Sequence, residues 1–133
     1  MLVTGLLGGW LASASLLRFT VAVLADANVD ASREVLEGAV AYFPQAAVLH
    51  TRLAAKLVES RIDATQDHAQ IAEFAGGHLH QAIRLVPYQF ENYVLLAVVD
   101  ELQDDLPGAE AALRQALQLA PQRLSVRWRL GNL

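Results

Sequence analysis

The sequence predicts an all-α protein, in which a solenoid of helix-turn-helix repeats follows an N-terminal transmembrane helix. Two observations support this fold class. The N-terminal segment up to Ala25 is strongly apolar and almost uncharged, and one pattern of prolines and small residues recurs through the rest of the chain. The predicted organisation is a transmembrane anchor over residues 1–25 and a repeat region over residues 26–133.

Composition excludes several classes of function. The 133 residues are enough for one domain with a sizeable core. Apolar residues make up 54% of the chain, above the usual share for soluble domains, and the excess lies in the N-terminal segment up to Ala25. The net charge is −4 and the ten basic residues are scattered singly, so no basic stripe is available to bind nucleic acid. The absence of cysteine excludes disulfides, thiolate zinc sites and cysteine nucleophiles.

The N-terminal segment from Leu2 to Ala25 contains one charged residue, Arg18. As a helix it would span ~36 Å at about 1.5 Å per residue, which is sufficient to cross a hydrocarbon core of roughly 30 Å. Arg18 lies near the end of the segment, where a long side chain can reach the headgroups. We therefore expect a single-pass membrane protein in contact with membrane lipid.

Two other interpretations of this segment stay open. A secretory signal peptide would have a basic start, which Met1–Thr4 lacks, and a small-x-small cleavage site, which Ala25-Asp26-Ala27 supplies. Alternatively, the segment is a buried or interfacial first helix that covers the repeats. The orientation is also open, because the positive-inside rule favours a cytoplasmic repeat domain, whereas a short N-terminal tail favours the opposite side.

Small residues share one face of the predicted span, as Gly5-x-x-x-Gly9 and Gly9-x-x-x-Ser13. Such faces let two transmembrane helices approach closely. Trp10 lies near mid-span, which suits packing against a neighbouring helix better than a place at the headgroups. We expect Gly5, Gly9, Trp10 and Ser13 to contact another transmembrane helix.

In the second half of the repeat region, matching residues are about 34 residues apart. This separation relates four pairs: Pro87 and Pro121, Ala75 and Ala109, Leu79 and Leu113, Ala82 and Ala116. An earlier copy has the same internal spacing and consists of Leu36, Ala39 and Pro44. These residues match Leu79, Ala82 and Pro87, but at a separation larger than 34 residues. At the same distance after each proline come Leu and a small residue: Leu53-Ala54, Leu96-Ala97 and Leu130-Gly131. The predicted units are about 30–44, 45–87 with an insertion, 88–121, and 122–133 as a partial unit.

This pattern resembles the tetratricopeptide repeat, a helix-turn-helix of about 34 residues with the pattern Trp-x2-Leu-Gly-x2-Tyr, then Ala-x3-Phe, then Pro. The matching residues are Tyr93, Leu96 and Ala97, followed by Ala109, Leu113, Ala116 and Pro121. Asp100 stands where the pattern has Tyr, and the Trp of the last copy comes one position late, as Trp128. The copy before Pro87 is longer than the others, with the extra residues placed around Glu59–Gln70. The resemblance covers the chain from about Asp30 to its end.

Turn residues and apolar spacing predict six helices: Asp30–Phe43, Ala46–Arg61, Asp67–Val86, Phe90–Gln103, Pro107–Ala120 and Leu124–Leu133. Asp104 or Asp105 is expected to cap the fifth of these, with Pro107 in its first turn. Gly76-Gly77 is expected to weaken or bend the third.

The last predicted helix stops at Gly131-Asn132-Leu133 without a second half to cover it. We expect either that another subunit covers Trp128 and Leu130 or that the natural chain is longer.

The resemblance also implies a binding surface, because the first helix of each unit lines the concave face in that family. Carried over position by position, the groove consists of Thr51, Ala55, Glu91, Val94, Val98, Leu102, Trp128 and Asn132. This mostly apolar groove suits an apolar helix or a neighbouring subunit. The alternative is that these residues pack against one another. Family members that grip a peptide's terminal carboxylate use a set of Lys and Asn residues that this chain lacks.

Four histidines are the only candidates for metal, cofactor or acid–base chemistry: His50, His68, His78 and His80. His78 and His80 are two positions apart on a helix, point to different sides and cannot hold one ion together. The sequence has no Gly-rich phosphate loop, serine elbow or spaced carboxylate pair. We therefore expect no enzyme activity, no catalytic residue, no metal site and no cofactor.

Two functions remain. The first is a membrane-anchored scaffold or accessory subunit, whose anchor packs within a larger membrane complex while the repeats bind a protein partner. The second is a fragment of a longer bacterial envelope enzyme, similar to the O-antigen ligases and polymerases that carry such repeats after their spans. A mass near 14.4 kDa in native membranes, with stoichiometric partners, would favour the first. A weaker third possibility is ligation of a pigment or haem by one histidine, which an absorption spectrum would test.

Overall fold

The computed structural model describes residues 33–60 and 68–133, and these two ranges form six α-helices and no strand. The helices are α2 (Arg33–Tyr42), α3 (Ala47–Ser60), α4 (His68–Leu85), α5 (Phe90–Leu102), α6 (Leu106–Leu119) and α7 (Leu124–Gly131). Each helix end predicted within the described ranges lies close to its observed position, one or two residues away at most. The all-α prediction is confirmed.

The predicted transmembrane segment, residues 1–25, lies outside the described ranges, together with Gly5, Gly9, Trp10 and Ser13. Among the helices of residues 33–60 and 68–133, none is both long and apolar enough to cross a membrane. The membrane anchor and its packing face therefore stay predictions.

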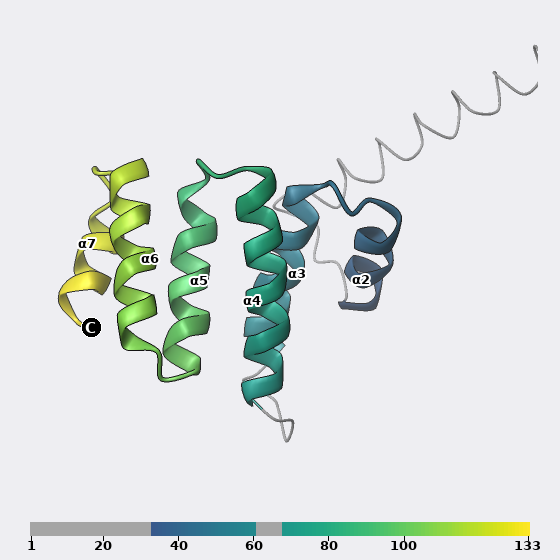
Figure 1. Cartoon of the computed structure of the whole chain (residues 1–133), viewed down its shortest axis with the longest axis horizontal. Coiled ribbons are helices and arrows are strands. Elements are labelled where there is room, and N and C mark those ends of the chain that lie inside the picture. Colours follow the sequence, from purple (N-terminus) through teal and green to yellow (C-terminus); the bar gives the residue numbers. More distant parts are fainter. Residues whose placement is uncertain (1–32, 61–67) are drawn as a thin grey trace, which may run out of the picture.

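The described helices pack as successive pairs (Figure 1). Helix α3 packs most extensively against α4, and α5 packs most extensively against α6, while α4 and α5 join the two pairs. Figure 1 shows α4, α5 and α6 side by side, with α3 behind α4, α2 at one end and α7 at the other. Consecutive helices with short connections run antiparallel. As a result the first helices of successive pairs also meet, α3 with α5.

Two clusters of buried apolar side chains hold the pairs together. The first core cluster joins α2, α3, α4 and α5 through Leu36, Leu53, Ala54, Leu57, Ile71, Ala72, Ala75, Leu79 and Val99. The second core cluster joins α5, α6 and α7 through Ala97, Ala109, Ala112, Leu113, Ala116 and Val126. Each fully buried Leu or Val contributes roughly 1.5–3 kcal/mol. Both clusters take side chains from more than one pair, so the pairs depend on stacking.

Alanine lines the closest helix contacts, as the spacing predicts. Ala109, Leu113 and Ala116 on α6 have no exposed surface, and neither do Ala75 and Ala82 on α4. A methyl side chain lets two helix backbones approach closely, and the leucine at the centre of the row fills the remaining space.

The three repeated prolines occupy equivalent turns. Pro44 follows α2, Pro87 follows α4 and Pro121 follows α6, each as the second residue of a four-residue connection. Such a connection ends the preceding helix, because proline lacks an amide hydrogen and restricts the residue before it. The structure thus repeats at the same places as the sequence.

The turn between α5 and α6 matches its prediction. The Asp105 carboxylate accepts a 3.0 Å hydrogen bond from the Gly108 amide, and Pro107 lies in the first turn of α6. Asp104 adopts a left-handed conformation with φ 58°, which Asp tolerates better than most residues. The predicted cap is therefore Asp105, while Asp104 forms the turn.

Gly76 and Gly77 do not interrupt α4, which is continuous from His68 to Leu85. Gly76 is buried against α5, and a Cβ there would lie 3.5 Å from the Cγ1 atom of Val99. A Cβ on Gly77 would meet nothing within 4 Å. Packing of α4 against both α3 and α5 compensates for the low helix propensity of the two glycines.

The extra residues of the 45–87 unit fall between the end of α3 and the first turn of α4. Helix α4 has 18 residues against 14 in α6, and α3 has 14 against 13 in α5. The rest fall in the connection over residues 61–67, which lies outside the described ranges. Ala75 comes seven residues after the start of α4, whereas the equivalent Ala109 comes three residues after the start of α6, so the longer α4 is extended at its N-terminus. The helix bounds therefore agree with the predicted location around Glu59–Gln70.

Candidate functional site

The eight predicted groove residues come from α3, α5 and the C-terminal segment around α7. The half-buried members are Thr51, Ala55, Val94, Val98 and Leu102, and the exposed members are Glu91, Trp128 and Asn132. Some of the half-buried residues are used for packing between the helices and are therefore less available to a partner.

Thr51 is committed to an internal contact between the two helix pairs. Its hydroxyl donates a 2.7 Å hydrogen bond to Oδ1 of Asn92, whose side chain is fully buried. The amide nitrogen of Asn92 in turn lies 3.4 Å from Oε1 of Gln89. Leu102 packs against the first core cluster. Thr51 and Leu102 therefore stabilise the stack of helices.

Val94 and Trp128 are the two groove residues that the structure brings together around a hollow. This hollow has a volume of about 210 Å³ and is lined by Val94 of α5 and by Ser125, Val126, Trp128 and Arg129 of α7. The Trp128 side chain is 73% exposed. An apolar indole that borders a hollow on the first-helix face can receive an apolar side chain from another molecule.

One cationic side chain, Arg129, lines this hollow. Arg129 forms a two-fold ion pair with Glu101 of α5, through Nε–Oε1 at 3.0 Å and Nη2–Oε2 at 3.1 Å. The guanidinium of Arg123 lies 5.0 Å from the ring centroid of Phe90. Arg127 is exposed on the same helix, and residues 120–133 contain no Asp or Glu. The only charged side chains of residues 120–133 are therefore arginines, and Glu101 balances the charge of the one at the hollow.

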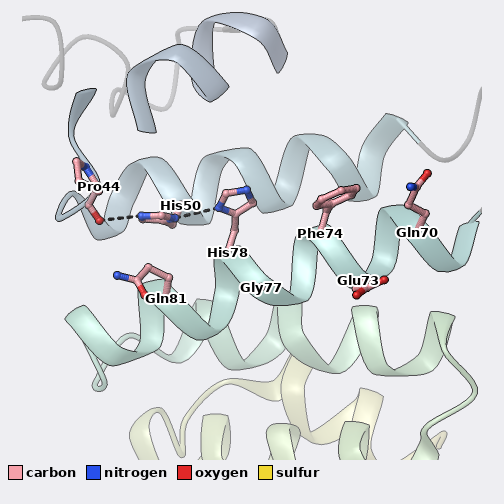
Figure 2. A pocket seen from close by; sticks show the side chains of 8 residues that line it. All are labelled: Pro44, His50, Gln70, Glu73, Phe74, Gly77, His78 and Gln81. Carbon is pink, nitrogen blue, oxygen red and sulfur yellow. Dashed lines mark hydrogen bonds between the residues drawn. The ribbon is translucent and has the colours of Figure 1, made fainter. Parts of the chain in front are cut away.

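A second feature was not predicted: His50 of α3 and His78 of α4 contact each other. Their Nδ1 atoms are 3.0 Å apart, and Nε2 of His50 lies 3.0 Å from the carbonyl oxygen of Pro44 (Figure 2). His50 is 5% exposed and occupies the packed face of α3 with Ala47 and Ala54. The helical spacing of these three residues in the sequence indicates that His50 lies on the packed face of its helix. It does not show which residue of the next helix His50 contacts.

The hydrogen bonds determine where the protons of this pair reside. The Pro44 carbonyl can only accept, so Nε2 of His50 carries a hydrogen and Nδ1 of His50 accepts. The Nδ1–H of His78 is then the donor, and Nε2 of neutral His78 has a free lone pair. Burial lowers the pKa of His78, the charge of His50 lowers it further, and the charge of Glu37 opposes both.

The histidine pair borders a pocket of about 620 Å³ on the outer face of α4, shown in Figure 2. Its lining residues are Pro44, His50, Gln70, Glu73, Phe74, Gly77, His78 and Gln81. His68 and His80 are exposed and do not line it. In the described part of the chain, no group of three or more His, Cys, Asp or Glu side chains is placed to hold a metal ion.

Neither models of known protein families nor curated proteins match this sequence. The tetratricopeptide resemblance therefore stays a prediction, and the functional argument depends on the geometry of the described helices.

Proposed function

We propose that the protein is a scaffold of tetratricopeptide-like repeats, anchored in a membrane by residues 1–25, that binds another protein subunit of a membrane complex. The face formed by α3, α5 and α7 is the binding surface, and Trp128, at its α7 end, contributes most to binding. The observation that carries this proposal is the exposed indole of Trp128 beside the hollow that it shares with Val94.

The energetics favour Trp128 over the rest of the predicted groove. Tryptophan and arginine are among the residues most enriched at the positions that dominate binding energy in protein interfaces. Thr51 already has a buried partner and Leu102 is packed in the core, so neither has much more to contribute. Burial of the indole by a partner would remove a large apolar surface from water.

The composition of residues 120–133 narrows the class of partner. Three arginines and no acidic residue occupy residues 120–133, whereas the whole chain has a net charge of −4. A partner helix with an apolar face and flanking Asp or Glu side chains would complement this surface. Attraction of this kind weakens as salt screens it.

The test is replacement of Trp128 by alanine in the full chain, purified from native membranes with its associated subunits. We expect the variant to fold as the wild type does, because Trp128 is mostly exposed, and to bind its partner at least about tenfold more weakly. Tyr88→Ala is the matched control, since Tyr88 is 74% exposed in the turn before α5. Equal partner recovery by Trp128→Ala and the wild type would contradict the proposal.

A further inference from the structure

The His50–His78 contact can accommodate one added proton but not two. In the neutral pair, the Pro44 carbonyl accepts from Nε2–H of His50, and Nδ1 of His50 accepts from Nδ1–H of His78. The first added proton can enter at Nε2 of His78, because this lone pair takes part in neither hydrogen bond. Both hydrogen bonds survive that step, and the Nδ1–H donor of His78 becomes stronger.

The second added proton has only one place to go, Nδ1 of His50. Two N–H groups would then face each other across 3.0 Å, and both rings would be positively charged. His50 is 5% exposed, so water cannot take over the lost hydrogen bond while the helices stay packed. The contact between α3 and α4 must open at this point for both rings to be protonated.

We propose that the His50–His78 pair is a pH-sensitive lock between α3 and α4, which holds with zero or one added proton and opens when both rings are protonated. This property does not depend on Trp128 or on the hollow that Trp128 shares with Val94. The lock also includes the α2–α3 connection, because His50 binds the Pro44 carbonyl. Acidification should therefore loosen the α3–α4 pair and its junction with α2.

Burial opposes a proton on His78, and among the charged groups near the pair Glu37 partly offsets this effect. Glu37 of α2 favours the charged form of His78 and is itself paired with Arg33 at 2.7 Å. Glu73 of α4 lines the same pocket as the two histidines. The second proton is opposed by the first across the short contact between the rings.

The direction of the pH effect follows from the number of bound protons. Both histidines can be protonated in the unfolded chain, whereas the folded pair binds at most one added proton. The unfolded state therefore binds more protons as the pH falls below 6.5, the ordinary pKa of histidine, and the folded state loses stability there. For each proton that the unfolded state binds in excess of the folded state, the folding equilibrium constant falls by up to about tenfold for each unit by which the pH is lowered.

The experiment compares the wild type with His78→Asn and His68→Asn in the full 133-residue chain, by denaturant unfolding between pH 5 and 8. The asparagine amide in His78→Asn can donate to His50 or, after a flip, accept from it. Between pH 7 and pH 5, the folding equilibrium constant of the wild type should fall by a factor at least about ten times larger than that of this variant. His68→Asn, which changes an exposed histidine of the same helix, should follow the wild-type profile.

A second measurement on the wild type does not depend on how any variant folds. Long-range ¹H–¹⁵N spectra of the imidazoles at pH 8 should show His78 as the Nδ1–H tautomer and His50 as the Nε2–H tautomer. An Nε2–H tautomer at both residues would overturn the proposal. Equal acid sensitivity of His78→Asn and the wild type would also overturn it.

Discussion

Asp100 illustrates how neighbours set the properties of a single residue. It lies near the end of α5, where the repeat pattern has Tyr, and it is half-buried beside the turn that begins α6. Burial raises the pKa of Asp100, the charge of Asp105 raises it further, and the charge of His80 opposes both. Because the folded state holds this proton more tightly than the unfolded chain, stability is lost as the pH rises through the folded-state pKa.

Replacement of Asp100 by asparagine should therefore stabilise the protein at pH 7. We expect a gain of about 0.3–0.5 kcal/mol in the free energy of unfolding, since solvent screens a half-exposed carboxylate. The gain should shrink towards zero as the pH falls below 3.8, where Asp100 is protonated in both states. Urea unfolding at pH 7, 5 and 3.5 checks this. A gain that does not change with pH would assign the effect to a cause other than charge.

At the scale of the helix, the same residue type has opposite effects at different places. Gly77 is in the middle of α4 with open space where a Cβ would be. Gly108 is in the first turn of α6, where a Cβ would collide with the carboxylate of Asp105 that caps the helix. Only the first glycine can be replaced without loss of a contact.

Gly77→Ala should stabilise the protein by up to about 1 kcal/mol, because alanine has the highest helix propensity and glycine nearly the lowest. Gly108→Ala should not show this gain. Its methyl group displaces the capping carboxylate, and loss of a cap costs roughly 0.5–2 kcal/mol. Thermal and urea unfolding of the two variants side by side provide the measurement. A destabilised Gly77→Ala variant would mean that the α4 helix requires glycine there.

At the scale of the whole molecule, polar contacts reinforce the stacking of one helix pair on the next. Thr51 of α3 reaches the buried Asn92 of α5, and Glu101 of α5 reaches Arg129 of α7. Each contact joins the first helices of adjacent pairs. The Thr51–Asn92 contact is the more costly to break, since an unpaired buried polar group is not compensated by water.

Thr51→Val should destabilise the protein by about 1–3 kcal/mol, because Oδ1 of Asn92 loses its donor while the shape of the side chain is kept. The double variant Thr51→Val with Asn92→Leu should be less destabilised than the sum of its single variants, since no buried polar group is then left unpaired. Ser60→Ala is the control, as its hydroxyl bonds only within α3, to the Leu57 carbonyl at 2.8 Å. Additive effects would show that Thr51 and Asn92 are not coupled.

Local patterns were sufficient to predict the helices and turns of the described ranges. Apolar residues at helical spacing, regularly spaced prolines and the Asp105-Leu106-Pro107 start of α6 act over short stretches, so they can be read directly from the chain. The same patterns correctly predicted that Ala109, Leu113 and Ala116 are buried.

Only the tertiary structure decided which residues meet across helices. The His50–His78 pair, the contact of Thr51 with the buried Asn92 and the hollow between Val94 and Trp128 each join residues far apart in the sequence and on different helices. Helical spacing gives the face on which a side chain lies but not the rotation and height of the opposing helix. Those are set by the packing of whole helices, because alanine rows and leucine side chains fit together in one arrangement.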